Sequence, residues 1–347
     1  MNEVIINNRI ISKYSEPYII AELSANHNGD IQRAFDIILA AKNAGADAIK
    51  IQTYTADTIT IKSTREEFQI KGGLWDGYDL YNLYKEAETP YEWHKDLFEY
   101  AKKIGITIFS SPFDSTAVDL LEELETPAYK IASPEIIDLP LIKRVAQTKK
   151  PMIISTGMAN FSEISEALEM ARENGCKDII LLHCISSYPT PIEESNLLTI
   201  TDLADKFGVL TGLSDHTMGT TVATVSVALG SCVIEKHFTL SRADKGPDSE
   251  FSLEPSELKR LCIDTKLAWK SLGEASYDLK ASETLTGRRS LYIIRDVKKG
   301  EKFTSENLKS IRPGLGLKPK YYNELIGKSA KVDVARGTPT SWDLLNN

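Results

Sequence analysis

Short apolar runs alternate with longer amphipathic stretches along most of the chain. The apolar runs are residues 18–21, 48–51, 107–110, 128–131, 152–154, 179–183, 209–212 and 233–235. Runs that are apolar throughout are typical of strands in a parallel sheet buried on both faces, and the stretches between them, such as residues 30–44, have helical periodicity. Eight strand–helix units between about residues 17 and 272 predict a (β/α)8 TIM barrel, which typically takes roughly 250 residues.

Two segments lie outside this repeat, one before its first strand and one within it. Residues 4–12 place Asn7-Asn8 between two apolar pairs, which predicts a β-hairpin that would plug the bottom of the barrel. Residues 54–89 form a long insertion after the second strand. Among the helices, residues 162–174 have the clearest boundaries, because Ser162 is a suitable N-terminal cap and Gly175 a suitable end.

The rhythm changes after residue 273. Residues 285–347 contain short β-like runs, at 290–294 and 331–334, with glycine-rich turns and no long amphipathic helix. We therefore predict a barrel domain over residues 1–273, a linker over 274–284 and a separate small domain over 285–347.

Composition excludes several functions. The chain has 347 residues, 42% of them hydrophobic, and a formal net charge of −8, so it offers no basic footprint for nucleic acid. An anionic ligand would need local Lys or Arg. No stretch reaches membrane-spanning length, and the four cysteines are scattered without CxxC spacing, which favours a reducing cytoplasm and no membrane partner.

The candidate chemistry lies at the predicted strand ends, because the loops after barrel strands form the active site of this fold. The polar residues there are Glu22, Lys50, Gln52, Ser111, Lys130, Ser133, Glu135, Ser155, Ser186, Tyr188, Ser214, Asp215, His216 and His237. Lys50 and Lys130 each stand between apolar neighbours, where a buried cation is costly unless an anion meets it. This pattern predicts a phosphate or carboxylate site, with a purely structural Lys–Glu network as the alternative.

The histidines suggest a metal. His216 and His237 follow successive strands, so their side chains can share one divalent ion with open coordination positions, and Mn²⁺, Mg²⁺ and Zn²⁺ remain open. The alternative for each is a hydrogen-bonded core histidine. Of the others, His27 is a candidate to face the site, His94 is expected on a helix surface and His183 in the core.

Two further loops carry candidate ligand-binding residues. Asp248 lies in a Gly-Pro-Asp turn directly after the His237 strand and could accept hydrogen bonds from a hydroxylated substrate; a plain surface turn is the alternative. Arg312 precedes Pro-Gly in the small domain, where composition alone favours a solvated side chain.

Taken together, these motifs resemble a known family. They are Ile20-Ala-Glu-Leu-Ser-Ala-Asn-His-Asn-Gly, Ile49-Lys-Ile-Gln-Thr, Ser111-Pro-Phe, Tyr129-Lys-Ile-Ala-Ser-Pro-Glu, Ile154-Ser-Thr-Gly-Met, Tyr188-Pro-Thr-Pro, Gly212-Leu-Ser-Asp-His-Thr, Glu235-Lys-His-Phe-Thr and Arg312-Pro-Gly. In this order they resemble the sialic acid (nonulosonate) synthase family across almost the whole chain. The tail looks like the antifreeze-like (SAF) domain that these enzymes carry.

The resemblance implies an enzyme, a transferase that condenses phosphoenolpyruvate with an N-acetylated amino sugar. His216 and His237 would ligate the metal, with Mn²⁺ or Mg²⁺ favoured. The residues implied for phosphoenolpyruvate are Lys50, Ser111, Lys130, Ser133 and Ser155. Glu22 and Glu135 would serve water attack and metal-linked contacts, and Gln52, Tyr188 and Asp248 would bind the sugar. Arg312 would reach the acetamido group from the tail of the partner in a domain-swapped homodimer.

Two features indicate a branch of the family. Ser186 stands where synthases of N-acetylneuraminate have Asn, and the aromatic-rich insertion at residues 72–94 resembles the pseudaminic acid synthase branch. The alternative for the insertion is a helical hairpin whose aromatic side chains pack on the outside of the barrel. The predicted acceptor is therefore 2,4-diacetamido-2,4,6-trideoxy-L-altrose, a 6-deoxy sugar, for flagellin glycosylation or a surface polysaccharide. The alternatives are an N-acetylneuraminate or legionaminate synthase and, more distantly, a non-catalytic sugar-phosphate-binding barrel.

Overall fold

Eight parallel strands close into a barrel in the computed structural model, which describes residues 3–345. The strands are β3 (Tyr18–Glu22), β4 (Ala48–Thr53), β5 (Thr107–Pro112), β6 (Tyr129–Ile131), β7 (Met152–Ser155), β8 (Ile179–Cys184), β9 (Leu210–Asp215) and β10 (Val233–His237). Each pairs with the next, and β10 closes the ring on β3. The predicted (β/α)8 barrel is confirmed.

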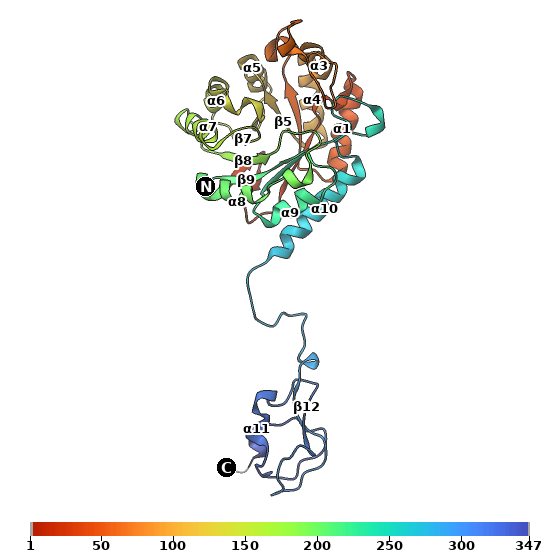
Figure 1. The fold of residues 1–347 in the computed structure, drawn as a ribbon, viewed down its shortest axis with the longest axis vertical. Coiled ribbons are helices and arrows are strands. Elements are labelled where there is room, and N and C mark those ends of the chain that lie inside the picture. The colour runs from red at the N-terminus through yellow and green to blue at the C-terminus, as the bar shows by residue number, and fades with distance from the viewer. Residues whose placement is uncertain (1–2, 346–347) are drawn as a thin grey trace. The chain divides into compact units, whose positions relative to one another are not determined.

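Helices follow the strands and surround them (Figure 1). They are α1 (Ile31–Ala44), α4 (Tyr91–Ile104), α5 (Ser115–Glu123), α6 (Leu139–Ala146), α7 (Phe161–Glu173), α8 (Leu198–Phe207), α9 (Thr221–Ala228) and α10 (Pro255–Leu272). The insertion after β4 contains two shorter helices, α2 (Ala56–Ile59) and α3 (Leu80–Ala87). The cap predicted for α7 is wrong: Asn160, not Ser162, accepts the first backbone N–H groups, because it stands two residues earlier.

Most strands run further than predicted. Glu22, Ser155 and His237 are the last residues of their strands instead of loop residues. The register pairs His237 with Glu22 and Glu22 with Lys50, so the backbone ladder continues past the apolar run. A polar side chain does not end a strand when it points into the mouth of a barrel, and these groups are therefore held on rigid backbone.

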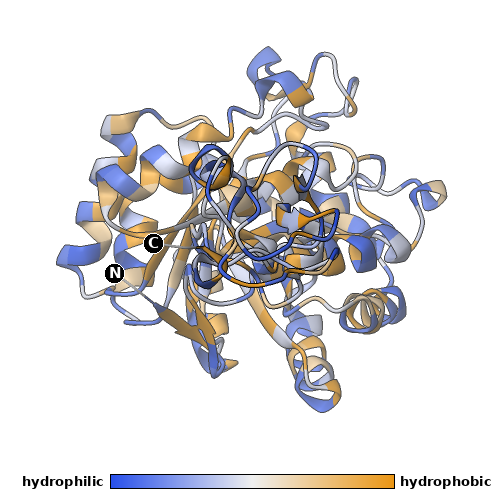
Figure 2. Cartoon of the chain, turned by 90° about the horizontal axis from the view of Figure 1, so that it is seen from below, coloured by the Kyte–Doolittle hydropathy of each residue, from blue (hydrophilic) through white to orange (hydrophobic). Residues whose placement is uncertain are grey.

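The barrel has two layers of core. One lies between strands and helices and includes Ile19, Ile51, Leu121 and Leu181. The other fills the lower barrel interior, where Val4 and Ile11 pack with the first residues of the barrel strands. In Figure 2 the barrel strands are mainly hydrophobic, whereas hydrophobic and hydrophilic residues alternate along the helices.

The predicted N-terminal hairpin is present. Strands β1 (Val4–Ile6) and β2 (Arg9–Ile11) pair antiparallel, and Asn7 and Asn8 both have positive φ, as the tight turn requires. Because Val4, Ile6 and Ile11 are buried in the lower interior, the hairpin closes the end of the barrel opposite the C-terminal ends of the strands.

The chain divides into two compact units, Met1–Gly273 and Glu274–Asn347. In the second, β11 (Ser290–Ile293) pairs antiparallel with β12 (Leu308–Ile311), and a one-turn helix, α11 (Tyr322–Leu325), follows. Leu291, Phe303 and Val334 belong to a separate core. The run at 331–334 is not a strand, although Val334 bridges to Val297. Within residues 3–345, no helix is long and apolar enough to cross a membrane.

Candidate active site

A cluster of buried charges occupies the barrel interior near the strand ends. Lys50 Nζ lies 2.9 Å from Glu22 Oε2 and 3.4 Å from Glu235 Oε1, and it donates to Ser111 Oγ at 3.2 Å. Burial works to lower the pKa of Lys50, but the two carboxylates outweigh it and the pKa is raised. Lys50 is therefore a charged, well-partnered cation.

Lys130 is less well satisfied. Its Nζ lies 3.8 Å from Glu235 Oε1 and donates to the carbonyl of Ile131 at 3.2 Å, so it shares one carboxylate with Lys50. Burial lowers the pKa of Lys130, and Glu235 offsets this only in part. A buried ammonium with a shared, distant carboxylate can accept a further anion, because an anion would lower the cost of burying the charge.

Glu235 was not among the residues predicted for the anion site, although it links the two lysines. The signal was present in the alternation of β10, since residues 235 and 237 must lie on one face and residue 236 on the other. Its Oε2 is buried and has no hydrogen-bond partner among the described residues. Glu235 also accepts a long hydrogen bond, of 3.4 Å, from Ser214 Oγ.

Serine hydroxyls gather around Gly157, the residue that follows Ser155-Thr156. The Gly157 N–H donates to Ser133 Oγ at 3.1 Å. A Cβ at position 157 would lie 2.7 Å from Ser133 Oγ and 2.5 Å from Ser186 Oγ, so only glycine leaves these hydroxyls in place. Ser155 Oγ and Ser186 Oγ are buried without a partner in the described part of the chain, and are free to bind a ligand oxygen.

A polar chain crosses from β4 to the loop that contains Asp248. Gln52 Nε2 donates to Glu22 Oε1 and to Ser24 Oγ, both at 3.0 Å, and Ser24 Oγ donates to Asp248 Oδ2 at 2.5 Å. The Asp248 loop is therefore fixed to the exit of β3 and is not a plain surface turn. Ser24 was missed, because no spacing in the sequence relates it to residue 248.

His216 and His237 come together, with ring centroids 5.4 Å apart. His216 Nδ1 lies 2.9 Å from the carbonyl of Ile185 and must donate to it, so Nε2 carries the lone pair when the ring is neutral. Burial works to lower the pKa of His216, but Cys184 and the Ile185 carbonyl outweigh it and the pKa is raised. His237 Nδ1 is buried and has no hydrogen-bond partner within residues 3–345; it lies 3.8 Å from Asp248 Oδ2. Burial lowers the pKa of His237 well below its ordinary range, so the ring is neutral, as a metal ligand must be.

These two imidazoles fit a divalent cation only as a partial site. No group of three or more His, Cys, Asp or Glu side chains in residues 3–345 is arranged to hold a metal. Nδ1 of His237, which is unpaired among the described residues, and Nε2 of a neutral His216 suit an ion whose remaining positions are filled by water and substrate.

Three buried carboxyl groups, those of Glu22, Glu135 and Asp248, have pKa values raised by burial. Burial raises the pKa of Glu22 to about 7, and it raises the pKa of Glu135 to about 7 as well. Glu135 lies in the turn Pro134–Ile137 after β6, and its Oε2 is buried with no hydrogen bond in the described residues. Groups that titrate near neutrality can take up or release protons during a reaction.

The other predicted positions divide as follows. The Tyr188 ring lies 4.4 Å from that of His216, inside the site. Arg312 is exposed on the loop after β12 and belongs to the second unit. The expectation for His94 is wrong: it is buried, and its Nε2 lies 2.8 Å from Thr53 Oγ1, because it shares the inward face of α4 with Leu97 and Ala101. His27 packs edge-on against Trp93 of α4.

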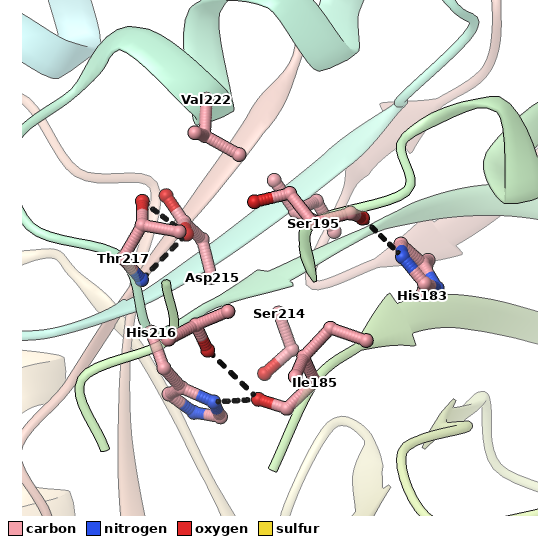
Figure 3. Close-up of a pocket in the computed structure, with 10 residues that line it drawn as sticks. His183, Ile185, Ser195, Ser214, Asp215, His216, Thr217 and Val222 are labelled. Atoms are coloured by element: carbon pink, nitrogen blue, oxygen red, sulfur yellow. Dashed lines mark hydrogen bonds between the residues drawn. The ribbon is translucent and has the colours of Figure 1, made fainter. Parts of the chain in front are cut away.

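Figure 3 shows a small cavity between the ends of β8 and β9. Its volume is about 10 Å³, enough for one water molecule at most, so it is a packing gap and not a substrate site. His183, one of its lining residues, is buried and donates from Nε2 to the carbonyl of Ser195 at 2.7 Å, which confirms the expected core role.

The residues that directly precede the two histidines, Asp215 and Lys236, form an ion pair that holds β9 and β10 in register. Asp215 and Lys236 are direct partners across β9 and β10, and Lys236 Nζ donates to Asp215 Oδ2 at 2.8 Å and to the Thr217 carbonyl. Asp215 Oδ1 accepts from Thr217 N and Oγ1. The pair thus fixes the residues on either side of His216.

We expect Lys236→Met to lower the free energy of unfolding of the barrel by about 3 kcal/mol, because it leaves the Asp215 carboxylate buried without its counter-ion. Urea denaturation followed by circular dichroism measures this. Lys206→Met, which removes an exposed pair with Asp202, is the control and should cost less than about 1 kcal/mol. Equal losses in the two variants would show that the buried pair has no special structural role.

Comparison with known protein families assigns both parts of the chain. The NeuB family model matches residues 37–277, and the SAF domain model matches residues 288–346. The chain therefore belongs to the NeuB family, the synthases that the barrel and its strand-end residues resemble.

Particular relatives are more informative still. A pseudaminic acid synthase of Campylobacter jejuni is 49% identical over 92% of this chain and 94% of its own. An N,N'-diacetyllegionaminic acid synthase of the same species is 42% identical over 90% of this chain and 95% of its own. The crystal structure of N-acetylneuraminic acid synthetase from Leptospira borgpetersenii, with citrate, superposes with a TM-score of 0.73 at 34% identity, covering 81% of this chain and 94% of that one.

Proposed function

We propose that the barrel condenses phosphoenolpyruvate with 2,4-diacetamido-2,4,6-trideoxy-L-altrose and water to give pseudaminic acid and phosphate. The observation that carries the proposal is the pair of buried lysines, Lys50 and Lys130, joined through Glu235 beside serine hydroxyls. The similarity to pseudaminic acid synthases supports this acceptor over the legionaminate precursor.

The cationic half of the site would bind phosphoenolpyruvate. Lys50, Lys130 and Ser111 would offer donors to the phosphate and carboxylate oxygens, and fixed donors in a buried site stabilise anionic oxygen strongly. The hydroxyls of Ser133, Ser155 and Ser186 add further donors around Gly157. Binding there would orient C3 of the enol ether toward the opposite half of the site.

The other half would bind the open-chain sugar. Gln52 and Asp248 offer an amide and a carboxylate to hydroxyl and acetamido groups, and Tyr188 offers a ring next to His216. Ser214 donates to Glu235, which also contacts the two lysines, and so adds a further polar side chain to the site. His216 and His237 would hold Mn²⁺ or Mg²⁺, which supplies Lewis-acid polarisation of an aldehyde oxygen when bound.

The reaction forms one carbon–carbon bond. C3 of phosphoenolpyruvate attacks C1 of the sugar, the C1=O π bond opens and its oxygen takes up a proton to become a hydroxyl, and water adds to the cationic C2. Glu22 or Glu135, with pKa values near 7, accepts the proton from that water. Phosphate then leaves with cleavage of the C2–O bond, and the 2-keto acid closes to its ring. Holding both reactants in line contributes much of the acceleration.

We also propose a homodimer in which Arg312 reaches the acetamido group from a second copy. Arg312 is exposed, and its loop is fixed by Ser290 Oγ donating to the Pro313 carbonyl at 2.7 Å and by Gly314 N donating to Leu285 at 2.9 Å. A rigid loop that carries an exposed cation suits recognition of a substrate oxygen.

Phosphate release tests the proposed function. The purified chain is incubated with Mn²⁺, phosphoenolpyruvate and, separately, the diacetamido altrose sugar, N-acetylmannosamine and the legionaminate precursor. We expect turnover with the altrose sugar and at most slow turnover with the other two. Preference for either of the others would assign the chain to a different branch, and silence with all three would favour a binding protein.

A further inference from the structure

The insertion after β4 forms a small lobe with its own turn. Ile70 N donates to the Tyr78 carbonyl at 2.8 Å and Gly77 N to the Ile70 carbonyl at 3.2 Å, so residues 70–78 close on themselves. Gly72 and Gly77 have φ angles of 79° and 87°, which residues other than glycine rarely adopt. Because the turn is closed by its own backbone, it can hold a side chain at its tip in a defined place.

The root of the lobe is fixed to the barrel. The Tyr84 ring of α3 lies 5.9 Å from that of Tyr54, edge to face, and Tyr54 contacts Phe113 at 5.0 Å. The Glu88 carboxylate accepts from Ala56 N at 2.9 Å. The base of the lobe is therefore held against the barrel.

Trp75, at the tip, lies against the sugar half of the site. Its Nε1 donates to the Pro247 carbonyl at 3.0 Å, one residue before Asp248. Its ring lies 5.8 Å from that of Tyr188, and Tyr188 in turn lies 4.4 Å from His216 and 5.1 Å from Phe251. Trp75 is thus joined to both loops that would bind the acceptor.

The chemistry that the indole can offer is limited. Tryptophan has one hydrogen-bond donor and no acceptor, and Pro247 already uses that donor. What remains for a ligand is apolar ring surface. A methyl group packs well there, whereas a hydroxymethyl group would lose water without gaining a partner.

We propose that Trp75 is a specificity-determining residue whose indole forms an apolar wall of the acceptor site and favours a 6-deoxy sugar over its 6-hydroxy counterpart. This inference rests on the proposed function, because it assumes that the acceptor binds beside Tyr188 and Asp248. It assigns the insertion a direct part in choosing the sugar.

The test compares two acceptors that differ only at C6. We measure kcat/KM for 2,4-diacetamido-2,4,6-trideoxy-L-altrose and for its 6-hydroxy counterpart, with saturating phosphoenolpyruvate and Mn²⁺. In Trp75→Ala, the ratio of kcat/KM for the 6-deoxy sugar to kcat/KM for the 6-hydroxy sugar should fall about tenfold, in line with the limited discrimination that apolar pockets give. The KM for phosphoenolpyruvate should stay within about twofold, because the lysine half is untouched.

Two further variants separate selection from folding. Trp75→Phe keeps an apolar ring and loses only the tether to Pro247, so it should keep most of the selectivity. Tyr78→Phe removes a hydroxyl that donates to Glu86 within the lobe, and should match the wild type. Melting temperatures of all variants establish that each is folded.

The outcomes are distinct. If Trp75→Ala left the ratio of kcat/KM for the 6-deoxy sugar to that for the 6-hydroxy sugar unchanged, even with both values lowered, the inference would be overturned and the proposed function would stand. A wild-type enzyme that releases no phosphate with the 6-deoxy sugar would overturn both.

Discussion

Replacement of Lys130 by Met should lower kcat/KM for phosphoenolpyruvate by about 10²–10³-fold, the usual effect of removing one donor to a charged oxygen in a buried site. Met keeps the length and the apolar stem of the side chain and removes only the ammonium. Folding should be retained, because Glu235 keeps its contact with Lys50 at 3.4 Å. Steady-state kinetics with both substrates varied measures the effect, which should fall mainly on the KM for phosphoenolpyruvate.

The same substitution at Lys150 is the matched control. Lys150 pairs with Glu122 at 2.6 Å just before β7 begins, at the end of the barrel opposite the site. Lys150→Met should therefore leave the kinetics unchanged. If Lys130→Met also kept its affinity for phosphoenolpyruvate, the buried lysines would be a structural network and the assignment of the anion site would be wrong.

Removal of divalent metal should abolish turnover, and Mn²⁺ should restore it. We expect His237→Ala to reduce Mn²⁺ affinity by at least about 100-fold, because a site with only two protein ligands loses half of them. Titration calorimetry and the electron paramagnetic resonance signal of free Mn²⁺ measure the binding independently of activity. The variant should remain folded, since His237 Nδ1 makes no hydrogen bond with any of the described residues whose loss would destabilise the barrel.

His183→Asn serves as the control for this second prediction. His183 is equally buried but its Nε2 is already bonded to Ser195, so the substitution should change stability and leave Mn²⁺ affinity alone. Full turnover by protein that has been stripped of metal and shown to contain none would contradict the two-histidine site.

The fold was predictable because its signals are local. Fully apolar runs mark buried parallel strands, and the helical stretch predicted at residues 30–44 is α1, which Gly45 ends. Adjacent strands also made one contact predictable, since Gln52 of β4 pairs with Ser111 of β5. The strand ends were set too early because polar side chains were taken as the start of loops.

The contacts that complete the site are not local. Glu235 meets Lys50 only because β10 closes the ring on β3, a pairing that depends on the whole barrel and not on nearby residues. Ser24 reaches Asp248, and Trp75 reaches Pro247, across loops whose paths the hydrophobic pattern does not determine. His94 is different: its place on the apolar face of α4 was visible in the helical spacing and was overlooked.

The central claim, that this site joins phosphoenolpyruvate to an amino sugar, is tested most directly with phosphoenolpyruvate isotopically labelled at the oxygen that bridges C2 and phosphorus. The labelled compound is incubated with enzyme, Mn²⁺ and the diacetamido altrose sugar, and phosphate and product are analysed by mass spectrometry. Our account predicts that phosphate keeps the label and appears in equal amount with a new nonulosonic acid. Unlabelled phosphate, or phosphate formed without the sugar, would contradict it.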